Sequence, residues 1–430
     1  MVEKMNKVET GFGKKGWILI IYCLITFYVC TAFKDTMNVA VYTFQEKYGW
    51  SQTLLLSLAS IGSYVTCIVI YILGILNATG KLKLRNVALI TGLIYACTIS
   101  LWGLIHSLGI FIVNYIVMTV GYTVWSQYAN NSICANWFPK KSGAVLGWTT
   151  IGFPLAAATN ALLFMTLMKH MTFEKVYLLF GILTLFVCIW GYFGFRDYPE
   201  EMGYHPDNDT SMTQDKIKEF LEQEDGISKS SIWTTSRMLA TKETWFISIS
   251  NGVMLLLASG SMGQMVVRFV SGGMELEMAI KMMTVVGIFA MVGSWAFGKY
   301  DYRAGVKKAV LLGIVMMFVA CGLYSINSFV PMVVGAAIIG AGLGGSSNFV
   351  VSCTSYYWKR KNFKKAYGTI LTITTVIGSA GALVVANLAN VFNYSVAYWL
   401  LMVLAAIAFL CMLFVKEGFV ERYEEQLSKI

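Results

Sequence analysis

Long apolar runs without charge are the feature that most constrains this chain. The first of them, GWILIIYCLITFYVCTAF, covers Gly16 to Phe33 without one charged residue. A helix needs roughly 20 apolar residues to cross a bilayer, because the hydrocarbon is about 30 Å thick and each residue rises about 1.5 Å. Similar runs recur along the chain, which is 57% hydrophobic and 13% charged. We therefore expect an all-α integral membrane protein, since a soluble protein of 430 residues needs more polar residues on its surface.

Hydropathy predicts twelve transmembrane helices in two groups of six, separated by a polar stretch. The spans centre near Leu24, Ser63, Cys97, Met118, Ala157 and Leu185, and then near Leu256, Gly287, Met317, Ile339, Ile377 and Ala405. The stretch from Arg196 to Trp233 is rich in charge and turn residues, and we expect a short amphipathic helix in it around Ile217 to Leu221. The predicted domains are an N-terminal bundle over residues 1–195, a linker over 196–240 and a C-terminal bundle over 241–430.

Lysine and arginine predict the orientation of these spans. When the loops are assigned alternately to two sides, 27 of the 33 basic residues fall on the side of the termini and the linker. The positive-inside rule then places both termini in the cytoplasm of a cell that carries this multi-pass protein in its membrane. The same asymmetry accounts for the net charge of +10 without a basic, aromatic-lined face for nucleic acid.

Several function classes lack their sequence signatures. The nine cysteines lie in or beside apolar segments and include no C-x-x-C pair, so neither a metal site nor another cofactor is indicated. No ATP-binding G-x-x-x-x-G-K-[ST] motif is present, and Asp35 is the only carboxylate predicted deep in a span. We expect a monomeric secondary transporter for a small organic solute rather than an enzyme. A membrane sensor with the same fold remains an alternative.

The two halves of the chain resemble each other. The fifth predicted span opens at Trp137 with WFPKKSGAVLGWTTIG, and the eleventh opens at Tyr357 with YWKRKNFKKAYGTILTITTVIG. Each combines an aromatic pair, a basic cluster and a Thr-Thr pair. Two six-helix halves related by an axis along the membrane normal are the arrangement of the major facilitator superfamily.

Four stretches make the resemblance more specific. They are EKYGWS at Glu46, NWFPKKSGAVLG at Asn136, YPEEMGYHPDND at Tyr198 and KNFKKAYG at Lys361. With them, the chain resembles the oxalate:formate antiporter family, the bacterial relatives of the monocarboxylate transporters. The resemblance implies transport of a monocarboxylate or related organic anion, by symport with protons or by antiport.

The superfamily's hairpin-loop motif is present in GKYDYRAGVKK, from Gly298 to Lys308. The resemblance implies that Asp301, expected at a helix start, pairs with basic groups of a neighbouring helix and holds the cytoplasmic side shut. The predicted gating residues are Asp301, Arg303, Lys140 and Lys141. The corresponding segment of the first half, GILNATGKLKLR, lacks the aspartate.

Two positions depart from the family pattern. The spacing GSWAFG puts Ser294 where the family has its carboxylate-binding arginine, and Thr374 stands where a lysine of the eleventh span is expected. Because both cations are missing, we do not expect oxalate to be the main substrate. Ser294 and Thr374 themselves are predicted to line the substrate site.

Adjacent opposite charges, Lys34 and Asp35, follow the first apolar run. Counted from Gly49 and Trp50, they fall where the family's first helix lines the central cavity. Charges near the middle of a bilayer face polar cavities and have partners, and side chains at i and i+1 do not face each other on a helix. We expect separate partners for the two, with Lys34 as a substrate ligand and Asp35 as the proton-coupling residue. Alternatively, the helix ends here and both charges reach the outer interface.

Other polar residues inside spans complete the predicted site. The substrate-binding set also contains Asn38, Gln127, Asn131, Asn251 and Asn348, although helix packing explains each of the last four equally well. Arg268 is expected to be an anchor at the outer interface rather than a ligand. The site is compatible with a monocarboxylate, an amino-acid-like zwitterion or a larger amphipathic acid.

Overall fold

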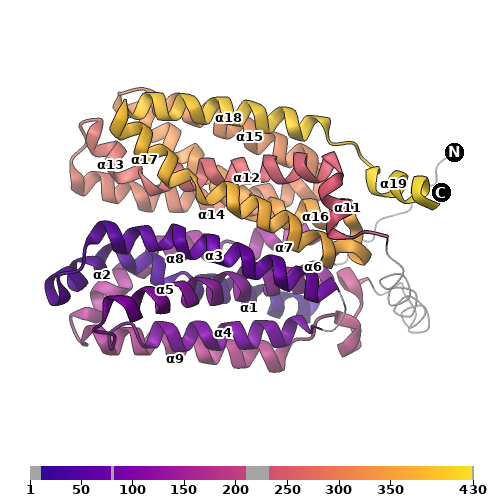
Figure 1. Cartoon of the computed structure of the whole chain (residues 1–430), viewed down its shortest axis with the longest axis horizontal. Helices are drawn as coiled ribbons and strands as arrows, with labels where there is room; N and C mark the ends of the chain where they lie inside the picture. The colour runs from indigo at the N-terminus through magenta and orange to yellow at the C-terminus, as the bar shows by residue number, and fades with distance from the viewer. Residues whose placement is uncertain (1–10, 79–81, 210–231, 429–430) are drawn as a thin grey trace.

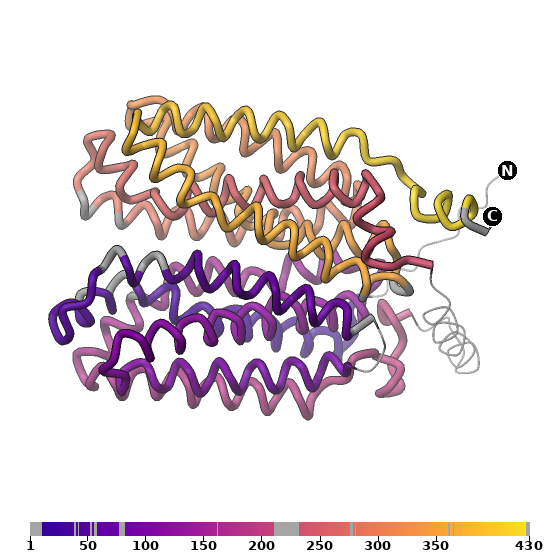
Figure 2. The backbone as a smooth tube through the Cα atoms, viewed as in Figure 1, coloured from indigo at the N-terminus to yellow at the C-terminus, as the bar shows by residue number. Residues whose placement is uncertain are grey.

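The computed structural model describes residues 11–78, 82–209 and 232–428. A few helical side chains, among them that of Asn38, lie outside the description, as does the amphipathic helix expected near Ile217. Two helical halves lie side by side along one long direction (Figure 1). Their tubes run back and forth along that direction, so that consecutive spans are antiparallel (Figure 2).

The first half, hereafter the N half, consists of ten helical elements. These are α1 (Gly13–Cys30), α2 (Ala32–Tyr48), α3 (Gln52–Ala78), α4 (Leu84–Ser100), α5 (Leu108–Thr123), η1 (Val124–Asn130), α6 (Asn131–Trp137), α7 (Ser142–Thr149), α8 (Gly152–Met168) and α9 (Phe173–Gly194). The first span passes from α1 into α2 through Thr31. The fourth passes from α5 into α6 through η1, which is a π-helical turn.

The second half, hereafter the C half, follows two short 3₁₀ turns of the linker, η2 (Pro199–Met202) and η3 (Pro206–Asn208). Its helices are α11 (Thr235–Ala240), α12 (Lys242–Gly263), α13 (Met265–Ser271), α14 (Leu276–Ala304), α15 (Val306–Ser325), α16 (Phe329–Ser379), α17 (Gly381–Val391), α18 (Tyr394–Phe414) and α19 (Phe419–Ser428). Helix α16 contains two spans, because its backbone turns sharply at Lys359, which has φ 53°.

Ten segments of the described chain are long and apolar enough to cross a membrane. The stretch from Ser142 to Met168, which contains α7 and α8, forms an eleventh if the bend of 42° between Asn160 and Leu162 is counted within one span, and α4 is apolar but only 17 residues long. These twelve segments contain the twelve predicted span centres, so the predicted fold is confirmed. Helices α6, α11 and α19 lie at one end of the bundle, hereafter the termini end, and α2, α13 and α17 lie at the opposite, far end (Figure 1).

Glycine pairs bring the two halves into backbone contact. A Cβ added at Gly147 in α7 would lie 2.9 Å from the Cα of Gly298 in α14, and one added at Gly74 in α3 would lie 3.0 Å from the Cα of Gly368 in α16. Only residues without a side chain allow helices to cross this closely. The hydrogen bonds between described residues of the two halves lie on the same side of the bundle as these contacts: Ser355 to Pro139, Tyr367 to Gln127, and those joining Ser294 and Asn348 to α7. The halves are thus closed against each other toward the termini end.

Candidate functional site

Lys34 lies inside the N half rather than at its edge. Helix α2 continues from Asp35 to Tyr48, so the alternative that the helix ends at these charges is wrong. The Lys34 ammonium lies 4.4 Å from the ring centroid of Tyr122, which is the 15th residue of the 30-residue span Leu108–Trp137. A second ring, that of Phe33, lies 5.7 Å away. Because Tyr122 is the middle residue of its span, Lys34 contacts the fourth span well inside the bundle rather than at its end.

The direct contacts that the Lys34 ammonium makes within the described chain are with aromatic rings. Its ammonium makes no hydrogen bond or ion pair with a described residue, and the side chain keeps part of its surface exposed. Cation–π contacts contribute about 0.5–2 kcal/mol each, which is less than the several kcal/mol that removing an ion from water costs. Lys34 is therefore a cation with an open coordination position.

Asp35 is held by a different set of groups. One carboxylate oxygen, Oδ2, accepts hydrogen bonds from the Thr31 hydroxyl at 2.8 Å and from the Asn160 amide at 2.9 Å. Asn160 belongs to α8 and is buried. Both bonds go to the same oxygen, so Oδ1 is left without a hydrogen bond to the described residues. As expected for neighbours on a helix, Lys34 and Asp35 have separate partners.

Gln127 connects this region to the C half. Its side-chain amide donates to the Tyr122 hydroxyl at 2.9 Å, and its backbone carbonyl accepts from the Tyr367 hydroxyl at 2.7 Å. Tyr367 also stacks on Tyr128, with ring centroids 5.8 Å apart. The ring of Tyr122, which contacts Lys34, is thus linked through Gln127 to Tyr367 of the C half.

Ser294 and Asn348 belong to a buried polar cluster between the halves. The Ser294 hydroxyl donates to the Gly147 carbonyl at 2.9 Å and lies 2.5 Å from the Thr150 hydroxyl, which also donates to the side-chain oxygen of Asn348 at 2.6 Å. The Asn348 amide donates to the Ser294 carbonyl at 3.3 Å. In this conformation the two predicted ligands are bonded to protein groups and join α14 and α16 to α7.

The remaining predicted ligands lie apart from Lys34. The Asn251 amide donates to the Ile247 carbonyl in its own helix at 2.8 Å, and the Thr374 hydroxyl donates to the Ser248 carbonyl at 3.4 Å. Asn131 is buried in α6, and its side-chain oxygen has no hydrogen-bond partner among the described residues. The side chain of Asn38 lies outside the description. The structure thus brings together Lys34, Asp35 and Gln127, and leaves the role of the others as a prediction.

The predicted gate differs from expectation in its geometry. Asp301 does not start a helix, because it lies in the last turn of α14. Its carboxylate faces the start of α7, where a Cβ at Gly143 would overlap it. A buried carboxylate at a helix N-terminus is stabilised by the helix dipole. Arg303 and Lys140 are exposed, and no ion pair joins Asp301 to a basic side chain among the described residues. Asp301 lines a cavity of about 610 Å³ that also reaches Asp207.

Asp207 fixes the linker to the turn between α6 and α7. Its carboxylate accepts hydrogen bonds from the backbone amides of Lys140 at 3.1 Å and Lys141 at 2.9 Å, and the Lys141 ammonium donates to the Asp207 carbonyl. Burial raises the pKa of Asp207 above its usual value, and the backbone hydrogen bonds oppose that rise. Lys141 is therefore bonded to the linker rather than to Asp301.

Arg268 is not an interface anchor, because it is buried. Its guanidinium donates to the carbonyls of Tyr324 and Ile326 and to the side-chain oxygen of Asn327. Carbonyls at a helix C-terminus lack partners within the helix, and a cation there also complements the helix dipole. Arg268 thus caps α15, a role that hydropathy does not reveal.

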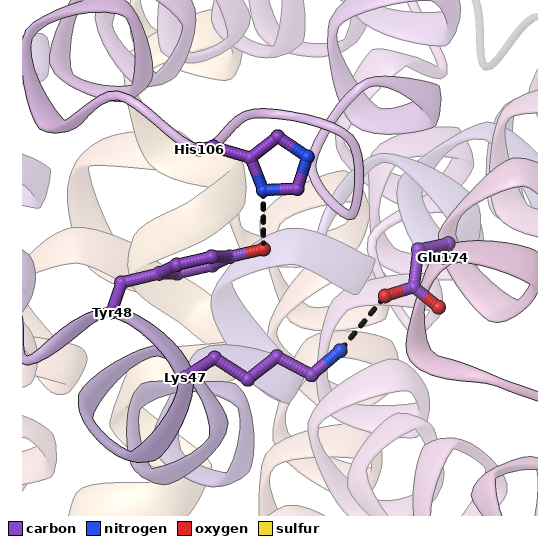
Figure 3. A network of polar contacts seen from close by, with 4 residues as sticks. All are labelled: Lys47, Tyr48, His106 and Glu174. Carbon is purple, nitrogen blue, oxygen red and sulfur yellow. Dashed lines mark hydrogen bonds and ion pairs between the residues drawn. The ribbon is translucent and has the colours of Figure 1, made fainter.

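Side chains at the far end tie the first span to the sixth and to the loop between α4 and α5 (Figure 3). The Lys47 ammonium pairs with the Glu174 carboxylate at 2.8 Å, and the Tyr48 hydroxyl is 3.1 Å from Nδ1 of His106. Both contacts are exposed and lie within the N half. They hold the end of α2 in place beyond Lys34 without contacting the C half.

Two contributors to the site were missed by reasoning from the sequence. Asn160 and Thr150 both sit within apolar stretches, and a polar residue in a span is itself a signal of a polar interior. Asn160 in AATNALLF carries that signal. Its partner, Asp35, is 125 residues away and follows only from the packing of α8 on α2.

Comparisons with known proteins agree with this architecture. The Major Facilitator Superfamily matches the chain over residues 24–303 and 275–427. No curated protein sequence matches it.

Three solved structures are similar over nearly their whole length. The human organic anion transporter MFSD10 (TETRAN) has a TM-score of 0.70 and 13% identity, over 92% of this chain and 98% of its own. The transporter FucP in its outward conformation has a TM-score of 0.68 and 14% identity, over 93% and 99%. The proton:xylose symporter XylE has a TM-score of 0.66 and 13% identity, over 94% and 96%. At these identities the likeness concerns the fold.

Proposed function

Since the chain belongs to the Major Facilitator Superfamily, a family of membrane transporters rather than enzymes, we propose that it carries a small organic anion, most specifically a monocarboxylate. It does so by alternating access, in which the two halves open in turn toward each end of the bundle. The four sequence stretches that resemble the oxalate:formate antiporter family support this assignment. One of the three similar structures, MFSD10, is that of an organic anion transporter.

The observation that carries the proposal is the open coordination position of Lys34. The Lys34 ammonium contacts aromatic rings and makes no ion pair with a described residue, although the negative charge of its sequence neighbour Asp35 acts on it through space. A substrate carboxylate supplies the direct ion pair and the hydrogen-bond acceptors that the described chain does not. Asp35 cannot replace it in this conformation, because the carboxylate is turned toward Thr31 and Asn160.

Charge balance then links the substrate to a proton. The empty site carries one positive charge on Lys34 and one negative charge on Asp35. A bound carboxylate adds a second negative charge, and a net charge in the closed bundle is costly. A proton on the free Oδ1 of Asp35 restores neutrality. We infer electroneutral movement of one proton with each monovalent anion, or proton-neutral exchange of one anion for another.

We expect Asp35→Asn to separate these two modes. The amide stays neutral, so anion exchange persists, whereas accumulation driven by a pH gradient falls at least about tenfold. The measurement compares counterflow and pH-driven uptake in proteoliposomes, with formate, acetate, L-lactate, pyruvate, alanine and oxalate as substrates. Glu201→Gln, an exposed change at the termini end, is the control.

The panel also separates the alternatives. Equal loss of exchange and accumulation in Asp35→Asn would contradict a coupling role. Oxalate as the best substrate would contradict the inference that Ser294 and Thr374, in place of two cations, disfavour a dicarboxylate. Uptake of alanine in preference to the monocarboxylates would support the zwitterion alternative, which the free Oδ1 of Asp35 favours. Saturable binding without any flux would point to a sensor.

Orientation is part of the proposal. The basic loops support a termini end on the cytoplasmic side of a cell membrane, and in that orientation the conformation described here, closed at the termini end, faces outward. The N half, the linker over 196–240 and the C half act within a single monomeric carrier. In this arrangement Asp301, Arg303, Lys140 and Lys141 lie at the cytoplasmic gate.

Cysteine labelling tests the orientation. A membrane-impermeant maleimide is expected to label Lys169→Cys, an exposed far-end position, in intact cells. Glu201→Cys, exposed in the linker, is expected to react only after permeabilisation. The reverse pattern would invert the proposed topology.

A further inference from the structure

A second cavity lies at the termini end of the N half, away from the contact between the halves. It has a volume of about 370 Å³ and is lined by the start of α1, the end of α6 and the linker. Its aromatic wall includes Phe12, Trp137 and Phe138, and Tyr204 extends it outward. Nothing in the proposed transport cycle uses this cavity.

The charges that line this cavity are positive. Lys14 and Lys15 line it from the first turn of α1, the Lys15 ammonium lying 5.2 Å from the ring centroid of Phe195, and no aspartate or glutamate is among the described residues that line it. That first turn contains no acidic residue, and its N-cap, Phe12, makes no side-chain capping bond. The unsatisfied amides and the dipole at the helix start add to the attraction for an anion.

The linker closes one side of the cavity and keeps its own carboxylates out. The Asn208 amide donates to the Gly11 carbonyl at 3.2 Å, which fixes the linker to the residues just before α1. Asp207 is turned away, because its carboxylate is bonded to the amides of Lys140 and Lys141. His205 lines the cavity, and its buried Nδ1 has no hydrogen-bond partner among the described residues.

The cavity lies beside the start of the first transmembrane span, where we expect lipid headgroups. The first transmembrane span begins at Gly13, beside the cavity, and the next turns of α1 expose Trp17 by 41% and Ile21 by 49% of their surface. Tryptophan is enriched where a span leaves the hydrocarbon. An anion bound between Lys14 and His205 would therefore have acyl chains adjacent to Trp17 and Ile21 if it belonged to a lipid.

We propose that this cavity binds a phosphate group, and that the group is the headgroup phosphate of an anionic phospholipid. Lys14 and Lys15 supply the charge, the first amides of α1 and His205 supply hydrogen bonds, and the aromatic wall contacts the glycerol region. Basic pockets between transmembrane helices on the cytoplasmic side bind such headgroups in other proteins. The proposal does not depend on which solute the protein carries.

The test measures binding to the purified full-length protein in a neutral detergent by microscale thermophoresis. Dioctanoyl phosphatidylglycerol is compared with dioctanoyl phosphatidylcholine, glycerol 3-phosphate and inorganic phosphate. Each basic residue near a membrane surface contributes about 1 kcal/mol, so Lys14→Gln with Lys15→Gln is expected to weaken phosphatidylglycerol binding about 30-fold. The matched control is Lys299→Gln with Lys308→Gln, two exposed lysines of the C half at the same end.

Comparing the two lipids with glycerol 3-phosphate and inorganic phosphate shows whether the bound phosphate belongs to a lipid or to a soluble compound. Tighter binding of phosphatidylglycerol than of the three other compounds, lost in the Lys14/Lys15 variant alone, supports the lipid headgroup. Equally tight binding of glycerol 3-phosphate at the same lysines would overturn the lipid assignment and leave a site for soluble phosphates. Binding that does not change in the variant, or that does not distinguish phosphatidylglycerol from phosphatidylcholine, would overturn the proposal. His205→Leu, expected to weaken binding several-fold, provides a second variant that leaves α1 intact.

Discussion

Replacing Lys34 with alanine is expected to weaken monocarboxylate binding about 100-fold while leaving the folded protein at least as stable as the wild type. Removing one member of a buried charge pair costs about 2–5 kcal/mol of binding, and about 3 kcal/mol corresponds to the stated factor. The empty protein loses no hydrogen bond or ion pair to a described residue, since Lys34 has only the rings of Tyr122 and Phe33 as partners. The folded protein thus loses a partly exposed cation that makes no ion pair with a described residue, whereas the substrate loses its counter-ion.

Binding and stability are measured together for this variant. Thermal unfolding of the detergent-solubilised protein, with and without the monocarboxylate that the wild type transports best, reports both quantities. Lys34→Arg keeps the charge and is expected to retain part of the affinity, and Lys175→Ala removes an exposed far-end lysine, outside the Lys47–Glu174 ion pair, as the matched control. Unchanged affinity in Lys34→Ala would contradict the proposed site, and a large loss of stability without substrate would mean that Lys34 has a structural role.

Enlarging Gly147 is expected to keep the termini end from closing and to reduce transport at least about tenfold. A Cβ at this position would lie 2.9 Å from both the Cα of Gly298 and the Ser294 carbonyl, and neither backbone group can rotate away. Overpacking of this kind costs about 1–3 kcal/mol, which is enough to favour the conformation in which the halves separate. Gly147→Leu should therefore populate the state that is open toward the termini end.

Distances between spin labels at Glu201 and Lys308, both exposed at the termini end, measure this opening. The distribution is expected to move to longer distances in Gly147→Leu. Gly109→Leu is the control, because a Cβ at Gly109 in α5 would meet no atom within 4 Å. If Gly147→Leu gave wild-type distances and transport, the close glycine contact would not be needed for closure.

The architecture could be predicted from the sequence because a bilayer imposes a simple pattern. Apolar runs of sufficient length define spans, and the predicted centres, from Leu24 to Ala405, all fall within helices. The position of Lys34 and Asp35 inside a helix was predictable for a related reason, since the distance from Gly49 and Trp50 placed both residues well before the end of the span. Their separate partners followed from the geometry of adjacent residues on a helix.

Other features depend on contacts between residues distant in sequence, and no local pattern encodes them. Asn160 bonds to Asp35 only because α8 packs on α2, and Arg268 caps α15 from a neighbouring helix. Asp301 was expected at a helix start, but α14 extends past it to Ala304, so the dipole that it meets belongs to α7. Hydropathy and motif spacing describe one helix at a time, whereas these contacts belong to pairs of helices.

The π-helical turn from Val124 to Asn130 has a consequence for how related chains should be aligned. Side chains five residues apart point about 140° away from each other in an α-helix, yet the Gln127 amide reaches the Tyr122 hydroxyl at 2.9 Å. The wider turn brings the two onto one face, as an inserted residue would. A relative whose fourth span is α-helical throughout should therefore show a one-residue gap here. Positions before the turn and positions after it are then offset by one residue relative to such a relative. An alignment without the gap would pair Gln127 with a residue on the wrong face of the relative's helix.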